Sequence, residues 1–136
     1  MGTSAPAPHR TVAQVMITTP ATHGVGMTIS EAGEVFEDAH VHMLLLISQG
    51  ELFGTVVRDD IETPLDPRRP AMEIATLAGR TIDPSRYIDD ALLLMNRGLR
   101  RRLAVVDSNQ TLVGLLCLKR TRDGFCSEAD VLARRN

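Results

Sequence analysis

MLLLISQGELFGTVVRDDI, residues 43–61, carries the clearest secondary-structure signal in the sequence. It places two apolar runs on either side of the polar turn Gln49-Gly50-Glu51, and this pattern predicts a β-hairpin. Residues 103–118, LAVVDSNQTLVGLLCL, repeat the arrangement 59 positions later around the turn Ser108-Asn109-Gln110. The chain therefore contains one motif twice. The predicted strands are 43–48, 52–58, 103–107 and 111–118.

A helix is predicted ahead of each hairpin. Residues 28–32, TISEA, lie over residues 87–91, YIDDA, and apolar residues then recur at three- and four-residue steps, as one buried helical face requires. Ser30 and Asp89 are the predicted N-caps, and Gly98 is the predicted end of the second helix. The two apolar stripes are Ala32, Val35, Phe36 and Ala39, and Ala91, Leu92, Met95 and Leu99.

Each copy opens with a short helical turn, predicted at 11–16 and 71–77, and with an extended piece, predicted at 21–25 and 79–82. The order β-α-β-β, twice, predicts an α+β fold in which two repeats, each too small to bury a core alone, pack face to face. The expected organisation is a flexible tail at 1–10, repeats at 11–61 and 71–121, a proline-rich linker at 62–70 and an extension at 122–136, with a capped helix over 127–132.

Composition excludes several classes of protein. The 136 residues are 43% hydrophobic, carry a formal net charge of −2 and include four aromatic residues, so nucleic-acid binding through excess positive charge or aromatic stacking is not expected. No apolar run approaches the roughly 20 residues that span a bilayer, so we expect no membrane association. Two cysteines without a metal-binding spacing favour a reduced, cytoplasmic protein.

Each copy resembles a CBS domain, named for its occurrence in cystathionine β-synthase, and the whole chain resembles a tandem pair, or Bateman module. The resemblance covers 11–121 and rests on Val12-x-x-Val15-Met16, the helix start at 28–32, the strand 44–47 and the glycine-led segment 54–61. It implies two repeats related by a pseudo-twofold axis, with two clefts between the sheets. Family members commonly bind AMP, ADP, ATP or S-adenosylmethionine there, and they regulate a partner protein without catalysis.

The resemblance also implies which residues would contact a ligand. The final strand of a CBS domain typically reads Gly-apolar-apolar-Thr/Ser-x-x-Asp, where the hydroxyl contacts phosphate or ribose and the Asp accepts hydrogen bonds from the ribose. In the first repeat Val57 stands at the hydroxyl position and Asp60 at the Asp position; in the second, Cys117 and Arg120 stand there, so the ribose clamp is missing. The predicted ligand-binding residues are Gly54, Val57, Arg58, Asp60, Thr22, Thr81, Cys117 and Arg120.

Several of these features have a plainer interpretation. Asp59 and Asp60 are equally typical of a helix N-terminus, where carboxylates satisfy free N–H groups. Arg100-Arg101-Arg102 fits solvated charge near a helix end as well as a patch for phosphate or an acidic partner. His40 and His42 share a strand face but have no third ligand nearby, so no metal site is predicted. Cys117 fits a small core residue and Cys126 an exposed position after a glycine turn.

No phosphate-binding glycine loop, Ser-His-Asp set or HExxH motif is present, so we expect no enzyme, no catalytic residues and no required cofactor. The leading hypothesis is a regulatory module that senses an adenosine-containing ligand, forms a homodimer and acts on an unidentified protein partner. The alternative is a degenerate CBS pair that serves as a structural interaction or dimerisation module, with its clefts filled by side chains such as Val57, Cys117 and Arg120.

Overall fold

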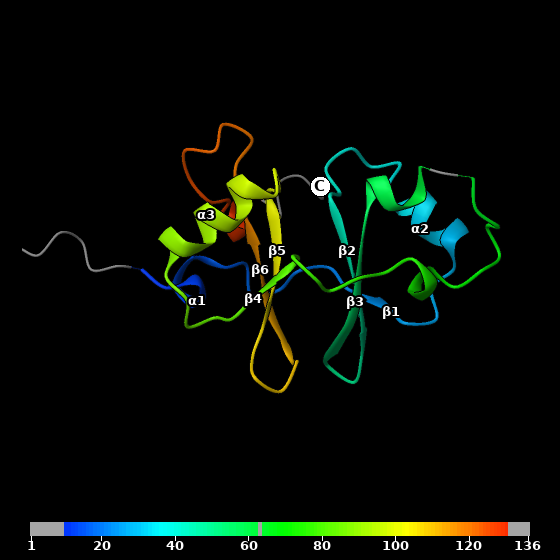
Figure 1. Ribbon diagram of the computed structural model, residues 1–136, viewed down its shortest axis with the longest axis horizontal. Helices are drawn as coiled ribbons and strands as arrows, with labels where there is room; N and C mark the ends of the chain where they lie inside the picture. The colour runs from blue at the N-terminus through cyan, green and yellow to red at the C-terminus, as the bar shows by residue number, and fades with distance from the viewer. Residues whose placement is uncertain (1–9, 63, 131–136) are drawn as a thin grey trace, which may run out of the picture.

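The computed structural model describes residues 10–62 and 64–130, which form two three-stranded sheets (Figure 1). In both sheets a short strand pairs parallel with the middle strand, which pairs antiparallel with the third. A register shift between Leu46 and Ile47 recurs between Val105 and Val106, at the equivalent positions. The predicted α+β fold of two repeats is confirmed. The strands are β1 (His23–Gly24), β2 (Met43–Ser48), β3 (Glu51–Val57), β4 (Thr81–Ile82), β5 (Arg102–Val106) and β6 (Leu112–Cys117).

The helices begin earlier than predicted. The first predicted helix is α2 (Ile29–Val35), and its N-cap is Thr28, not Ser30. The Thr28 hydroxyl accepts the Glu31 N–H at 3.1 Å, while the Glu31 carboxylate accepts the Thr28 N–H at 2.8 Å, which is a capping box. The second helix, α3 (Ile88–Arg97), has Tyr87 as its N-cap, so the prediction of Asp89 is also wrong.

The end of α3 has an unusual left-handed residue. Gly98 is the C-cap, as predicted, but Leu99 takes the left-handed conformation with φ 53°. The Arg100 N–H donates to Met95 O at 2.8 Å and the Leu99 N–H to Asn96 O, the pattern of a Schellman motif. Glycine usually occupies the position of Leu99 in this motif.

The opening segment of each repeat packs against the core of the other. Val12, in α1 (Val12–Val15), is buried in a cluster with Ile82 and Met95 of the second repeat. Ala71, in the 3₁₀ helix η2 (Ala71–Glu73), is buried with Phe36 and other residues of the first. Figure 1 accordingly shows α1 beside α3, across the molecule from β1 to β3. The two repeats are interlocked by this exchange.

Two equivalent glycines allow the exchange. A Cβ at Gly54 would lie 2.6 Å from the Ala75 Cβ, and a Cβ at Gly114 would lie 2.6 Å from the Met16 Sδ. Between the sheets, a third apolar cluster includes Leu45, Leu52 and other residues of both repeats. Each repeat therefore supplies part of the hydrophobic core of the other repeat, as expected for units too small to bury a core alone.

The remaining segments flank these cores. A second 3₁₀ helix, η1 (Arg58–Ile61), follows β3 directly. Residues 128–130 are helical. The Ser127 N–H donates to the Asp130 carboxylate, and the Asp130 N–H donates to the Ser127 hydroxyl. The rest of the helix predicted over 127–132 lies outside the described residues, as does most of the tail predicted at 1–10. Within residues 10–62 and 64–130, no helix is long and apolar enough to cross a lipid bilayer.

Candidate functional site: two cationic cavities between the repeats

Two cavities lie at the edge of the sheets where β2 and β5 begin. The larger cavity, about 530 Å³, is lined by residues 57–59 at the end of β3, by Arg80, and by residues 98–102 ahead of and within β5. The smaller cavity, about 400 Å³, is lined by Ala39, His40 and His42 and by residues of the second repeat and the segment after it, including Lys119 and Arg120. Both cavities therefore take residues from both repeats.

The charge of these cavities is strongly positive. Five arginines line the larger cavity together with a single carboxylate residue, Asp59: these are Arg58, Arg80, Arg100, Arg101 and Arg102. The ionisable side chains that line the smaller cavity, among the described residues, are basic or histidine: His40, His42, Arg101, Arg102, Lys119 and Arg120. Because the net charge of the chain is −2, this clustering is a local property of the site and does not reflect a basic protein.

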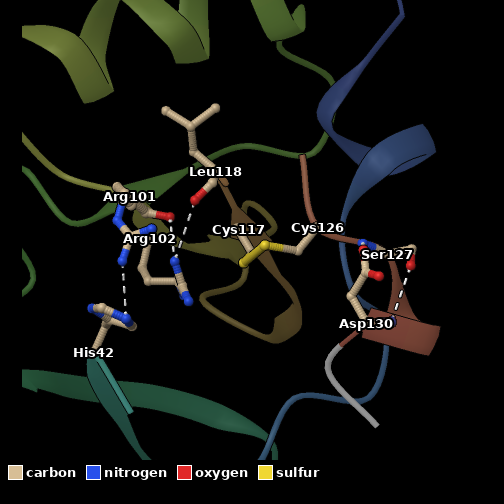
Figure 2. Close-up of a disulfide and its surroundings, with 8 residues drawn as sticks. All are labelled: His42, Arg101, Arg102, Cys117, Leu118, Cys126, Ser127 and Asp130. Carbon is tan, nitrogen blue, oxygen red and sulfur yellow. Dashed lines mark hydrogen bonds between the residues drawn. A yellow bond between two sulfur atoms is a disulfide. The ribbon is translucent and has the colours of Figure 1, made fainter. Parts of the chain in front are cut away.

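His42, Arg101 and Arg102 line both cavities and so join them. His42 and Arg101 occupy equivalent positions in the two repeats, and their Nε2 and Nη2 atoms lie 3.1 Å apart (Figure 2). A contact between equivalent residues lies close to the pseudo-twofold axis. Arg102 is buried, and its Nη1 donates to the carbonyls of Arg101 and Leu118 at 3.1 and 3.5 Å.

Arg80 is the functional candidate that the sequence did not indicate. Its Nη1 and Nη2 donate to the two carboxylate oxygens of Asp60 at 2.8 and 3.0 Å, and its Nη1 also donates to Thr55 O at 3.1 Å. Only 7% of the Arg80 side chain is exposed, and its Nε is buried without a hydrogen-bond partner among the described residues. Arg80 directly precedes the two-residue strand β4, which gives little signal, whereas Arg102 begins the otherwise apolar strand β5.

Asp60, the predicted ribose acceptor, is held in this ion pair. It also accepts the Val57 N–H at 2.9 Å, and 19% of its side chain is exposed. Burial raises the pKa of Asp60, but the hydrogen bonds from Arg80 and Val57 and the charges of Arg80 and Arg100 outweigh burial and hold the pKa below its ordinary value of 3.8. Asp60 is therefore a carboxylate at neutral pH. Arg80 lines the larger cavity, whereas Asp60 does not.

Backbone carbonyls hold Arg58 at the wall of the larger cavity. Its guanidinium donates to the carbonyls of Phe36, Val41 and Asp38 at 2.5, 2.9 and 3.3 Å, and it lies 5.1 Å from the centre of the Phe36 ring. These partners are neutral groups of the segment between α2 and β2. They orient the guanidinium, and the Asp38 carboxylate also interacts with its charge.

Cys117 and Cys126 form a disulfide, which corrects the prediction that the cysteines are reduced (Figure 2). Their Cα atoms are 5.3 Å apart, and both residues are buried, so the expected exposure of Cys126 is also wrong. The turn after β6 folds back on itself: the Lys119 N–H donates to Gly124 O, and the Cys126 N–H donates to Cys117 O at 2.7 Å. Cys126 also lines the smaller cavity.

The predicted ligand-binding residues are brought together only in part. Val57 and Arg58 line the larger cavity, and the exposed Arg120 lines the smaller one. Gly54, Thr22, Thr81 and Cys117 line neither of these two cavities; Gly54 packs against Ala75, Thr22 is exposed and Thr81 is half-buried in β4. The role of all eight residues in ligand binding stays a prediction.

Two interlocked repeats with paired cavities define the class of tandem CBS-type modules. The family model described as "CBS domain" matches residues 73–120. The CBS domain-containing protein YhcV of Bacillus subtilis strain 168 is 30% identical over 112 residues, which are 79% of this chain and 79% of that protein. The chain belongs to the CBS domain family.

Solved structures of CBS pairs share the fold. The CBS domain protein PAE2072 of Pyrobaculum aerophilum, complexed with AMP, is 24% identical with a TM-score of 0.68, over 92% of this chain and 98% of that one. The CBS domain pair of protein MJ0100, in complex with 5′-methylthioadenosine and S-adenosyl-L-methionine, is 20% identical with a TM-score of 0.66, over 93% and 95%.

Proposed function

We propose that the protein is a non-catalytic regulatory module that senses an adenosine phosphate in the larger cavity. The observation that carries this proposal is the arrangement of the cavity wall, where arginines stand beside the apolar side chains of Met43, Val57 and Leu99. A nucleotide needs this combination, because its base is apolar on both faces and its phosphates are anionic. Leu99, which is 86% exposed, would pack against the base.

The charge of the cavity favours some adenosine ligands over others. Solved CBS pairs with the same fold hold AMP, ATP, or S-adenosylmethionine with methylthioadenosine. S-adenosylmethionine carries a cationic sulfonium, which the arginines at the larger cavity would repel, whereas they attract the phosphates of AMP, ADP and ATP. We therefore expect this protein to prefer the phosphorylated ligands.

Regulation would follow from the position of the ligand. Val57 and Arg58 belong to the first repeat and residues 98–102 to the second, so a ligand in the larger cavity contacts both repeats. Such a ligand stabilises the orientation of the repeats in which both sets of contacts form, and a protein partner that prefers one orientation detects the ligand. No chemical step is required.

A homodimer is part of the proposal. Leu93 and Leu94 on α3 are 59% and 42% exposed, and a second copy of the chain would cover them in a twofold interface. Light scattering coupled to gel filtration would give the mass of a dimer for the wild type and of a monomer for Leu93→Glu. A monomeric wild type at micromolar concentration would contradict this part.

One observation favours the structural alternative. Asp60, at the Asp position of the first repeat, is engaged with Arg80, and Cys117, at the hydroxyl position of the second, is engaged with Cys126. A pair of repeats whose family ligand positions are occupied in this way would act through its surfaces alone.

Ligand binding separates the two functions. Thermal unfolding and isothermal titration calorimetry should be run with AMP, ADP, ATP and S-adenosylmethionine on the wild type, on Arg100→Ala at the larger cavity, and on Arg68→Ala as a surface control. The side chain of Arg68 is 90% exposed and pairs with Asp66, its neighbour in the linker. ATP should raise the Tm of the wild type and the control but not of Arg100→Ala. No heat with any ligand up to millimolar concentration would favour the structural alternative.

A further inference from the structure

We infer that the Cys117–Cys126 disulfide is a redox-sensitive clamp on the wall of the larger cavity, so that its reduction weakens ligand binding there. The inference deepens the proposed function and rests on it. Three observations carry it: the loop that the disulfide closes, the hydrogen bonds of Arg122 from that loop to the cavity wall, and the position of Cys126 at the smaller cavity.

The disulfide closes the loop 118–125 at the end of β6. On the outgoing side Leu118 is buried in the core of the second repeat, whereas on the returning side Phe125 is only partly buried against it. The residues between them are largely exposed and are joined by two backbone hydrogen bonds, from the Lys119 N–H to Gly124 O and from the Arg122 N–H to Lys119 O. A loop with so few buried contacts depends on its closure for its order.

Arg122 connects this loop to the wall of the larger cavity. Its Nη2 donates to Met95 O at 3.2 Å and to Arg100 O at 3.3 Å, and its Nε donates to Asn96 Oδ1 at 3.2 Å. Met95 O also accepts the Arg100 N–H that ends α3. Arg122 therefore holds the turn from which residues 98–102 line the cavity. Because Arg122 itself lines neither of the two cavities, it is a positioning residue and not a ligand contact.

The turn that Arg122 holds needs support from outside. Leu99 has a φ of 53°, a left-handed conformation that a leucine disfavours. When the loop loosens and Arg122 leaves, the turn is free to adopt other conformations. The fraction of molecules with residues 98–102 in the binding arrangement then falls, and the apparent affinity for a ligand in the larger cavity falls with it.

A dithiol reductant has a path to the disulfide through the smaller cavity. Cys126 lines this cavity beside Lys119 and Arg120, and cationic side chains favour an approaching thiolate. The thiolate attacks the Cys126 sulfur, the bond to Cys117 breaks, and the second thiol of the reductant resolves the mixed disulfide. Two electrons and two protons pass to the protein, which ends with two thiols, while the dithiol ends as a disulfide.

Hydrogen exchange with and without dithiothreitol tests the clamp without a ligand. The three larger apolar clusters contain neither cysteine, so the reduced protein should stay folded by circular dichroism. In the reduced wild type the amides of residues 98–102 should exchange at least about fivefold faster, while those of α2 do not change. Arg122→Ala should show the same faster exchange with its disulfide intact. Thr121→Ala, an exposed residue of the same loop that bonds to Asp123, should not.

Calorimetry with ATP tests the control of binding. Reduction of the wild type should weaken ATP by about fivefold or more, and so should Arg122→Ala without reduction. Arg122→Lys keeps the charge but has one nitrogen in place of three, so it should also bind ATP more weakly than the wild type. Cys126→Ser should bind ATP equally with and without dithiothreitol. By linkage, saturating ATP should make the disulfide harder to reduce by the same factor as its loss of affinity.

Several outcomes would overturn the inference and leave the proposed function standing. These are unchanged exchange at residues 98–102 on reduction, equal or tighter ATP binding by the reduced protein, unfolding of the whole chain on reduction, and a disulfide that dithiothreitol cannot reduce while the chain stays folded. If AMP, ADP and ATP all fail to bind the oxidised protein, the proposed function and the inference both fail.

Discussion

Arg80 and Asp60 form a bidentate ion pair between the start of the second repeat and the end of the first, with N–O distances of 2.8 and 3.0 Å. Asp60 occupies the position where the family pattern places a ribose acceptor. The ion pair therefore connects the two repeats and also competes with a ribose for the Asp60 carboxylate. Removing one member of a buried pair usually costs more than the pair contributes, because the other charge stays buried and unpaired.

Replacing Asp60 should therefore destabilise the protein. We expect Asp60→Ala to lower the free energy of unfolding by about 3 kcal/mol, because Arg80, whose side chain is only 7% exposed, loses its counter-charge. Urea unfolding followed by circular dichroism measures the change. The neighbouring Asp59 is exposed, so Asp59→Ala should change stability by less than about 0.5 kcal/mol. Equal losses in both variants would show that the ion pair is not the cause.

The same pair predicts a pH dependence. The pKa of Asp60 is lower in the folded protein than its ordinary value of 3.8, so its stabilisation is fully present above that value and is lost as the pH falls through the folded pKa. The charged groups that face Asp60 and lower its pKa are the guanidiniums of Arg80 and Arg100.

Urea unfolding of the wild type and Asp60→Asn between pH 7 and pH 2.5 checks this dependence. The stability difference between the two proteins should be constant from pH 7 to about pH 5 and should shrink at lower pH. A difference that stays constant down to pH 2.5 would contradict the shifted pKa.

The disulfide should contribute measurably to stability. Cys117 and Cys126 close a loop with a sequence separation of nine, for which chain entropy predicts about 2.5 kcal/mol. We expect Cys126→Ser to lose about this amount under oxidising conditions. In dithiothreitol the wild type should fall to the level of the variant, and the variant itself should not change.

The disulfide also bears on location. The cytoplasmic location is predicted from cysteines taken as reduced, and the disulfide removes that ground because disulfides are uncommon in reducing compartments. Thiol alkylation in intact cells, followed by mass analysis, would count the reduced cysteines. Full alkylation at both positions would mean that the bond is not formed in the cell.

Leu99 should affect both the stability of α3 and the choice of ligand, because it has a left-handed backbone and lines the larger cavity. Its φ of 53° disfavours a leucine, so Leu99→Gly should stabilise the end of α3 by up to about 1 kcal/mol. The same change removes an apolar wall of the larger cavity, so ATP should bind more weakly while tripolyphosphate binds as before. Calorimetry with both ligands measures the effect. Equal loss for both would show that Leu99 shapes the cavity and does not contact the base.

The strands were predictable because their signal is local. Residues 43–48 form β2 with the predicted bounds, since a short apolar run beside a glycine turn has few other solutions. The predicted N-cap of α2 is wrong although Thr28 and Glu31 have the spacing of a capping box, because Ser30, two residues after Thr28, is an equally good capping residue type.

The site was less predictable because it depends on contacts that are distant in the sequence. Arg80 acquires its role from Asp60, twenty residues away, and nothing near Arg80 in the chain indicates that partner. The disulfide depends on a turn that brings Cys126 back onto β6, and two cysteines alone do not indicate this path. The arginines at 100–102 were recognised as a cluster, but only the packing of the two repeats places them on one cavity with Arg58 and Arg80.

A crystal structure of the protein grown with millimolar ATP would show directly whether the larger cavity binds a nucleotide. We expect the triphosphate to lie in the larger cavity within hydrogen-bonding distance of the guanidiniums that line it, with the base against Leu99. An unliganded larger cavity under these conditions, with the Arg80–Asp60 pair intact and ATP absent or bound elsewhere, would contradict it.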